Sequence, residues 1–216
     1  TLLPKERGHQ IIFIAGRAPG HNTNDFWEGM KVYRFASLLL PKTDEKFYVG
    51  FPRVSQIKKI LVDEKIDIVH IVVPTPAAIS AVFAARALGI PIVVHSHTQP
   101  ENLFLNAMHM RAVWFANFAS ALLYYYLHWL YAKVDIIIFP TEFARQLFKG
   151  LPARAETFVI SNGVDAIKFK HRDPTEMYKK FNLRAENQFF LYVGRLHAAN
   201  SVDTILRGMP MVVGQD

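Results

Sequence analysis

The stretch "IDIVHIVVPTPAAISAVFAARALGIPIVVHSHT", residues 66–98, contains the pattern that decides the fold. A run of mostly β-branched residues opens it, an alanine-rich segment follows, and a second apolar run closes it. Thr75 suits the N-cap of a helix, Pro76 its first turn, and Gly89 the position just past its end. The stretch therefore predicts a strand, a helix and a second strand, which is the order of a parallel βαβ unit.

The same alternation continues on both sides of this stretch. Apolar runs predict further strands, and helical spacing with cap residues predicts further helices. Because the strands are apolar on both faces, we expect an α/β fold with a mostly parallel sheet covered by helices on both sides. The predicted strands are residues 10–16, 134–140 and 157–165, and the predicted helices are residues 54–65 and 141–150.

A change of composition after Val164 indicates a second domain. Residues 165–188 are highly charged and predict a connector with one short helix. An apolar run at residues 189–196 then predicts a new strand, and residues 201–209 predict a new helix. The chain opens without Met and stops after an apolar run, so we expect truncation at both ends. The predicted domains are residues 1–161 and residues 162–216, the second only partly present.

Composition narrows the classes of partner. The 216 residues carry a formal net charge of +7, which favours an anionic partner such as membrane lipid, a nucleotide or nucleic acid. There is no cysteine, so disulfides and thiolate metal sites are excluded. The sequence has no nucleic-acid recognition module, metal-ligand spacing, nucleophile elbow or Walker motif. We therefore predict no nucleic-acid partner and no metal site.

Residues 112–132 contain no charged residue and are flanked by Arg111 and Lys133. Their length could span a membrane, but a span would put segments of one sheet on opposite sides of the bilayer. A buried core helix remains an alternative. We favour an amphipathic helix that meets the membrane or the acceptor, with Trp114, Phe118 and Trp129 as contacts. On a continuous helix one side carries Trp114, Phe118, Leu122, Tyr125 and Trp129, and another carries Asn117, Ser120, Tyr124, His128 and Tyr131.

Several of these segments, in this order and spacing, resemble retaining GT-B glycosyltransferases of glycosyltransferase family four. The resemblance implies two Rossmann-like domains that face each other across a cleft. Residues 1–161 would form the acceptor-side domain without its first strand, and residues 162–216 would begin the nucleotide-sugar domain. The segments are "RGHQIIFIAG" (7–16), residues 66–98, "VDIIIFPTEFARQLF" (134–148), "VISNGVDAIKF" (159–169) and "LYVGRL" (191–196).

The resemblance also implies an activity. A hexosyltransferase of this family would move a hexose from a UDP- or GDP-linked sugar, with retention at the anomeric carbon and without a metal or other cofactor. The basic charge and the aromatic segment favour a lipid-linked or membrane-proximal glycan acceptor, an anionic membrane surface as partner, and a peripheral location on the cytoplasmic face of the membrane. The alternatives are a soluble sugar or polysaccharide acceptor, or a non-catalytic membrane-associated binding protein. We expect the 216-residue chain by itself to be inactive.

The candidate catalytic residue is His97. It follows the strand at residues 92–95, and ligands of parallel sheets bind at the carboxyl ends of the strands. In the family, the histidine at this position faces the sugar, which an imidazole could help to orient. A histidine that only packs at a strand end is the alternative. The side chain of His95 should lie on the same face as that of His97 but one step deeper in the strand. We interpret His95 and His70 as packed strand residues.

The resemblance assigns donor binding to Asn162, Gly194, Arg195 and Asn200. The guanidinium of Arg195 suits a diphosphate, and the N-terminus of the following helix adds partial positive charge. Where the family usually has a lysine, this sequence has Asn200. Three alternatives stay open: donor binding is weak, His197 or Arg207 compensates, or Asn200 is a variant of a parental lysine.

Overall fold

The computed structural model describes residues 8–40, 46–98, 113–148, 150, 155–184, 186, 189–194, 196 and 201–213. The side chains of residues 113, 115, 116, 212 and 213 are outside this description. The chain forms two compact units, Thr1–Ser161 and Asn162–Asp216.

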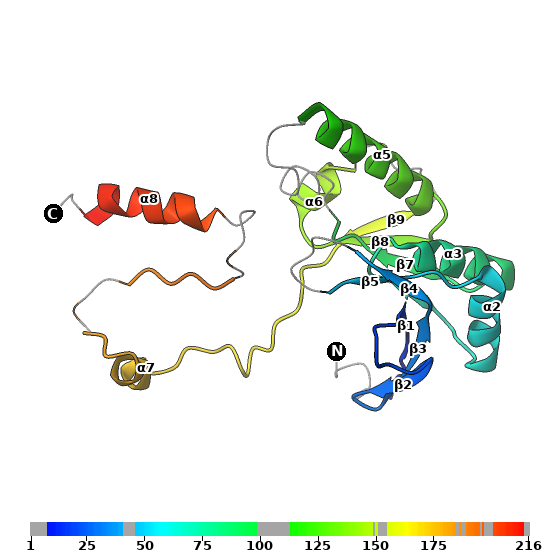
Figure 1. Ribbon diagram of the computed structural model, residues 1–216, viewed down its shortest axis with the longest axis horizontal. Helices are drawn as coiled ribbons and strands as arrows, with labels where there is room; N and C mark the ends of the chain where they lie inside the picture. The colour runs from blue at the N-terminus through cyan, green and yellow to red at the C-terminus, as the bar shows by residue number, and fades with distance from the viewer. Residues whose placement is uncertain are drawn as a thin grey trace. The chain divides into compact units, whose positions relative to one another are not determined.

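A parallel sheet forms the centre of the first unit (Figure 1). It has the order β6-β7-β8-β9, and every neighbouring pair runs parallel, which confirms the predicted parallel sheet. These strands are β6 (Val69–Ile71), β7 (Ile92–His95), β8 (Ile136–Phe139) and β9 (Glu156–Val159).

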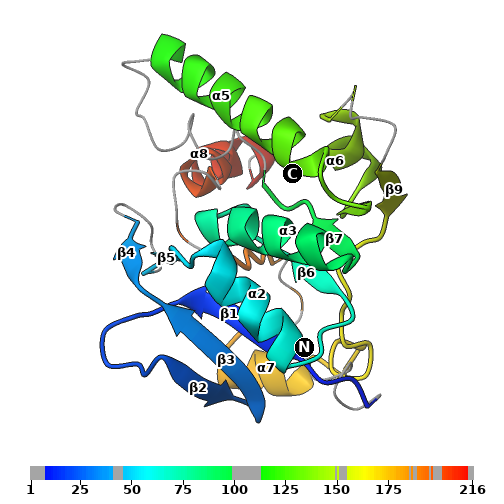
Figure 2. The same cartoon turned by 90° about the vertical axis from the view of Figure 1, so that its right-hand side faces the viewer.

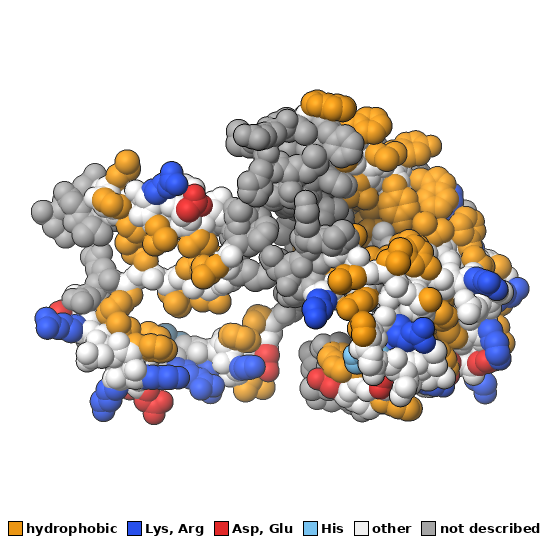
Figure 3. Space-filling model, in the orientation of Figure 1, with side chains coloured by type: hydrophobic (Ala, Val, Ile, Leu, Met, Phe, Trp, Pro, Cys, Tyr) orange, Lys and Arg blue, Asp and Glu red, His pale blue; other side chains and the backbone are white. Residues whose placement is uncertain are grey.

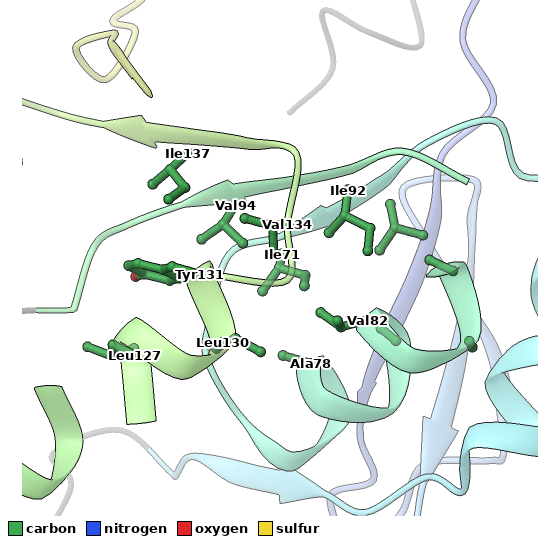
Figure 4. Packing of buried hydrophobic residues seen from close by; sticks show 14 of the residues in the cluster. Ile71, Ala78, Val82, Ile92, Val94, Leu127, Leu130, Tyr131, Val134 and Ile137 are labelled. Atoms are coloured by element: carbon green, nitrogen blue, oxygen red, sulfur yellow. The ribbon is translucent and has the colours of Figure 1, made fainter. Parts of the chain in front are cut away.

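The hydrophobic core lies on one face of this sheet. Figure 4 shows side chains of α3 (Pro76–Leu88) and α5 (Val113–Tyr131) packed against the strand residues Ile71, Val94 and Ile137. The core cluster contains no side chain from the opposite face, on which His70, Val93 and His95 lie. In the described part of the chain, the predicted cover of helices on both faces is therefore seen on one face only.

Local sequence signals explain the helix ends. Gly89 follows α3 with φ 70°, a left-handed conformation that favours glycine. Thr75 precedes α3, but its side chain makes no capping hydrogen bond. Thr141 does cap α6 (Glu142–Gln146), because its Oγ1 accepts a hydrogen bond from the backbone N–H of Ala144 at 3.1 Å.

The helix α2 (Val54–Asp63) packs beside α3 (Figure 2). It buries Ile57, Ile60 and Leu61, as the helical spacing of its apolar residues predicts. Two short sheets complete the first unit, with the orders β1-β3-β2 and β4-β5. Their strands are β1 (Ile12–Gly16), β2 (Asn24–Trp27), β3 (Met30–Phe35), β4 (Ser37–Leu39) and β5 (Tyr48–Gly50).

The second unit contains two described helices, α7 (Thr175–Lys180) and α8 (Val202–Val213). Both helices were predicted. The strand predicted at residues 189–196 is not formed among the described residues, where Phe190, Leu191 and Val193 are exposed. A strand needs a hydrogen-bonded neighbour, and no strand is described in this unit. The prediction of a strand here was therefore wrong.

Candidate functional site

His97 lies two residues beyond the end of β7, at the carboxyl edge of the parallel sheet, and its side chain is exposed. The intervening residue fixes the backbone there. The N–H of Ser96 donates to the carbonyl of Ile138 at 2.8 Å, and the Ser96 hydroxyl accepts from Tyr131 at 2.9 Å. Ser96 is buried, so the chain alternates an inward serine with an outward histidine.

Two more histidines lie beside His97. The ring centroids of His95 and His97 are 4.0 Å apart with an interplanar angle of 31°, and those of His70 and His95 are 6.2 Å apart at 11°. The parallel register pairs His70 with Val93, so His95 follows two residues further along on the same face. The three residues form a row, here named the histidine cluster. Alternation along the strand predicts that His95 and His97 share a face, but sequence reasoning missed His70, because the register between β6 and β7 is not a local property.

The environment favours neutral rings at His95 and His70. Burial lowers the pKa of His95, and the nearby charges of His97 and His70 lower it further. Burial also lowers the pKa of His70, with a smaller effect from His97. The Nε2 atom of His95 is buried without a hydrogen-bond partner among the described residues. A protonated His95 would therefore be costly.

We expect the free energy of unfolding to fall as the pH drops below about 6.5, the ordinary pKa of histidine. Because the pKa values of His95 and His70 are lowered in the folded protein, these two residues bind protons below that pH more readily in the unfolded chain. Acid therefore favours unfolding. The loss grows until the pH passes the lowered pKa values of the folded protein. Urea unfolding at a series of pH values, compared with His95→Gln, measures this effect.

The variant His95→Gln should flatten this pH dependence, whereas His9→Gln, at an exposed histidine outside the cluster, should leave it in place. Identical pH profiles for His95→Gln and the unchanged protein would contradict the assignment to His95.

The helix α5 exposes several large apolar side chains. The exposed fractions of Trp114, Phe118 and Tyr125 are 75%, 63% and 73%. Figure 3 shows hydrophobic side chains gathered over this helix. A contiguous apolar patch of this kind is typical of an interaction surface. Trp114, Phe118, Leu122 and Tyr125 are here named the α5 outer face.

The opposite side of α5 anchors the helix to the core. Leu127, Leu130 and Tyr131 are buried there, and burial raises the pKa of Tyr131 to about 12. Ser120 is buried on this side as well. Of the predicted polar side, Ser120 and Tyr131 therefore face the protein, whereas Asn117 is exposed. Both sides of the helix carry large aromatic residues, so composition alone does not say which side faces outward. The packing of the whole unit decided this orientation.

Trp129 does not share the exposure of the α5 outer face. It is half-buried, with its ring 6.2 Å from those of Phe83 and Tyr126, and the Nζ of Lys133 lies 4.6 Å from its centroid. Trp129 is thus a packing residue at the edge of the α5 outer face, and its role as an acceptor or membrane contact stays a prediction. Within the described part of the chain, no helix combines the length and apolar character needed to cross a membrane.

The residues assigned to donor binding belong to the second unit. Asn162 is exposed at its start, and Gly194 lies in the exposed segment before α8. A Cβ atom at Gly194 would lie 2.6 Å from the hydroxyl of Tyr192, so a larger residue would displace that side chain. Arg195, His197 and Asn200 lie outside the described residues. Their predicted roles stay predictions.

Comparison with known proteins shows the class of protein to which this chain belongs. The sequence pattern described as Glycosyltransferase Family 4 matches residues 3–168, and the chain therefore belongs to that family. The resemblance to GT-B glycosyltransferases is thus confirmed, and so is the α/β fold class. No group of three or more His, Cys, Asp or Glu residues able to hold a metal ion occurs in the described ranges.

Among curated proteins, the chain is similar to the alpha-monoglucosyldiacylglycerol synthase of Streptococcus pneumoniae. The identity is 23% over 209 residues, which cover 94% of this chain and 45% of the relative. Among solved structures, it is similar to the sucrose-phosphate synthase of Thermosynechococcus elongatus, with a TM-score of 0.64 at 12% identity. That alignment covers 96% of this chain and 51% of the other. The chain therefore spans about half the length of each.

Proposed function

We propose that the protein transfers a hexose from a UDP- or GDP-linked sugar to a lipid-linked or membrane-proximal acceptor, with retention at the anomeric carbon. Membership of Glycosyltransferase Family 4 supports the reaction class. The observation that carries the acceptor class is the α5 outer face, which exposes large apolar side chains in the same unit as His97. The relative from Streptococcus pneumoniae is named for a glucosylated diacylglycerol, which is a lipid.

The proposed roles follow from the chemistry of the side chains. The exposed imidazole of His97 would hydrogen-bond a sugar hydroxyl and so orient the anomeric carbon. Arg195 would stabilise the negative charge that develops on the departing nucleoside diphosphate, with Gly194 allowing close approach of the backbone. Asn162 and Asn200 would bind the donor through their amides. This mechanism uses no metal or other cofactor.

The α5 outer face would place the protein peripherally on the cytoplasmic face of the membrane. Its apolar side chains would enter the interface between headgroups and acyl chains. The formal net charge of +7 would add attraction to anionic lipid. The acceptor headgroup would then reach the sugar donor without leaving the membrane.

Sugar transfer by the full-length protein tests the proposal. The protein would be incubated with radiolabelled UDP-glucose or GDP-mannose and with vesicles that contain diacylglycerol or a monoglucosyl diacylglycerol. We expect label in the organic extract, and NMR of the product should give the anomeric configuration of the donor sugar. Vesicles without either acceptor are the control. Label only in water-soluble products would contradict a lipid acceptor, and no transfer from either donor would contradict the enzymatic function.

A further inference from the structure

A pocket of about 250 Å³ lies at the carboxyl ends of β1 and β3, beside the first turn of α2. The polar residues that line it include Arg17, Thr23, Asn24, Arg34 and Gln56. None of these residues belongs to the histidine cluster or to the α5 outer face. The chemistry of this lining indicates what the pocket binds.

The guanidinium of Arg34 has an unfilled hydrogen-bond donor. Its Nε atom is buried and has no hydrogen-bond partner among the described residues, although Asp25 Oδ2 lies 3.4 Å away. That carboxylate also contacts His21 Nδ1 at 3.2 Å and accepts from the backbone N–H of Phe26 at 2.8 Å. These contacts, that with His21 first, hold the pKa of Asp25 below its usual value. Asp25 is therefore shared among several donors and leaves Arg34 incompletely paired.

The second guanidinium belongs to Arg17, which is exposed and makes no ion pair with any acidic side chain in the described ranges. Its backbone position is defined, because the Ser37 hydroxyl donates to the Arg17 carbonyl at 2.6 Å and the Arg17 N–H donates to Phe35 at 2.9 Å. Arg17 thus carries a positive charge that no acidic side chain in the described ranges balances, whereas Arg34 shares the carboxylate of Asp25 with other donors.

The helix α2 adds to this positive character. It has no acidic residue in its first turn, so the partial positive charge of its N-terminus is not offset there. Gln56 lies in that turn, and its side-chain oxygen accepts from the backbone N–H of Arg53 at 2.9 Å. The amide nitrogen of Gln56 is then the group that can donate. Thr23 and Asn24 supply further donors at the pocket wall.

We propose that this pocket binds a phosphate group. Two guanidinium groups, amide and hydroxyl donors and a helix N-terminus are the elements that recognise phosphate. Small-molecule sites usually measure about 300–1,000 Å³, so the pocket suits a phosphorylated headgroup rather than a whole nucleotide-sugar. The phosphate can come from an anionic phospholipid or from a soluble phosphate ester. Only the lipid source rests on the proposed function, which places this unit at a membrane.

The test compares two double variants of the full-length protein. Arg17→Gln with Arg34→Gln removes the two guanidinium groups of the pocket. Lys58→Gln with Lys59→Gln removes two charges from exposed positions on α2 that do not line the pocket. Binding of glycerol 3-phosphate is measured by calorimetry, and binding of phosphatidylglycerol vesicles by sedimentation. Circular dichroism shows whether each variant is folded. If the double arginine variant does not fold, the single variant Arg17→Gln, at an exposed residue, replaces it in the test.

We expect the double variant Arg17→Gln with Arg34→Gln to bind phosphate at least tenfold more weakly, which is about 1.4 kcal/mol. The double variant Lys58→Gln with Lys59→Gln should change this affinity much less. Loss of glycerol 3-phosphate binding identifies a soluble phosphate ester, and loss confined to vesicles identifies a lipid headgroup. Equal weakening in both double variants, or none in the double arginine variant, would overturn the proposal. Sugar transfer is assayed separately, so a protein that binds phosphate but transfers no sugar would contradict the proposed function and leave the pocket assignment intact.

Discussion

Replacing His97 by alanine should lower kcat/KM for sugar transfer by about 10²-fold, the loss that follows when a reacting group is no longer well positioned. The free energy of unfolding should change by about 0.5 kcal/mol or less, because His97 is exposed and substitutions at such positions rarely cost more. The effect on activity should therefore greatly exceed the effect on stability.

The geometry of the strand end is the reason for this separation. Ser96, the neighbour of His97, is buried and bonded to Tyr131 and Ile138, so the backbone at this point is held without the imidazole. His97 itself contacts the ring of His95 at a centroid distance of 4.0 Å. Loss of that one ring contact leaves the buried core cluster unchanged, since His97 is not part of it.

The measurement pairs initial rates of sugar transfer with urea unfolding of the same preparations. His9→Ala, at an exposed histidine outside the histidine cluster, is the matched control and should keep full activity. If His97→Ala lowered the midpoint of unfolding in proportion to its activity, His97 would be a structural residue and the catalytic assignment would be wrong.

Serine at both Trp114 and Phe118 should weaken binding to vesicles that contain anionic lipid by about 10²-fold or more. Burying one large apolar side chain contributes roughly 1.5–3 kcal/mol, so losing two removes at least about 3 kcal/mol. Both side chains are well exposed on the α5 outer face, so the fold should remain intact. Binding should also fall as salt rises, because the Debye length shrinks from about 10 Å at 0.1 M to about 3 Å at 1 M.

Trp129→Ser is the contrasting variant. Because Trp129 is half-buried against Phe83 and Tyr126, this change should lower the free energy of unfolding by about 0.5–3 kcal/mol. Vesicle sedimentation and thermal unfolding of both variants separate the two roles. If the Trp114 and Phe118 changes left vesicle binding as it was, the α5 outer face would not be a membrane contact, and a soluble acceptor would be favoured.

Periodicity was enough to predict those parts of the fold that depend on neighbours along the chain. The buried face of α2, with Ile57, Ile60 and Leu61, follows from helical spacing, and the parallel sheet follows from strands that are apolar on both faces. The apolar run at residues 189–196 shows the limit of this reasoning. It has the composition of a strand, but a strand also requires a neighbour, and none is described there.

The candidate site was predictable to a lesser degree. His97 was identified by its place after a strand and by a family resemblance that the match to residues 3–168 confirms at the level of the family. Its catalytic role stays a prediction. Alternation also predicts that His95 shares a face with His97. His70 was not placed beside them, because nothing in the sequence states which residues of β6 and β7 lie side by side.

The sequence by itself determined the βαβ pattern, the buried face of α2 and the position of His97 after a strand, because these depend on residues within one or two turns or strands of each other. Only the tertiary structure decided the place of His70 in the histidine cluster, the side of α5 that faces outward and the pocket around Arg17 and Arg34. Each of these depends on the register and packing of segments that are distant in sequence, and many arrangements of such segments satisfy the same local pattern.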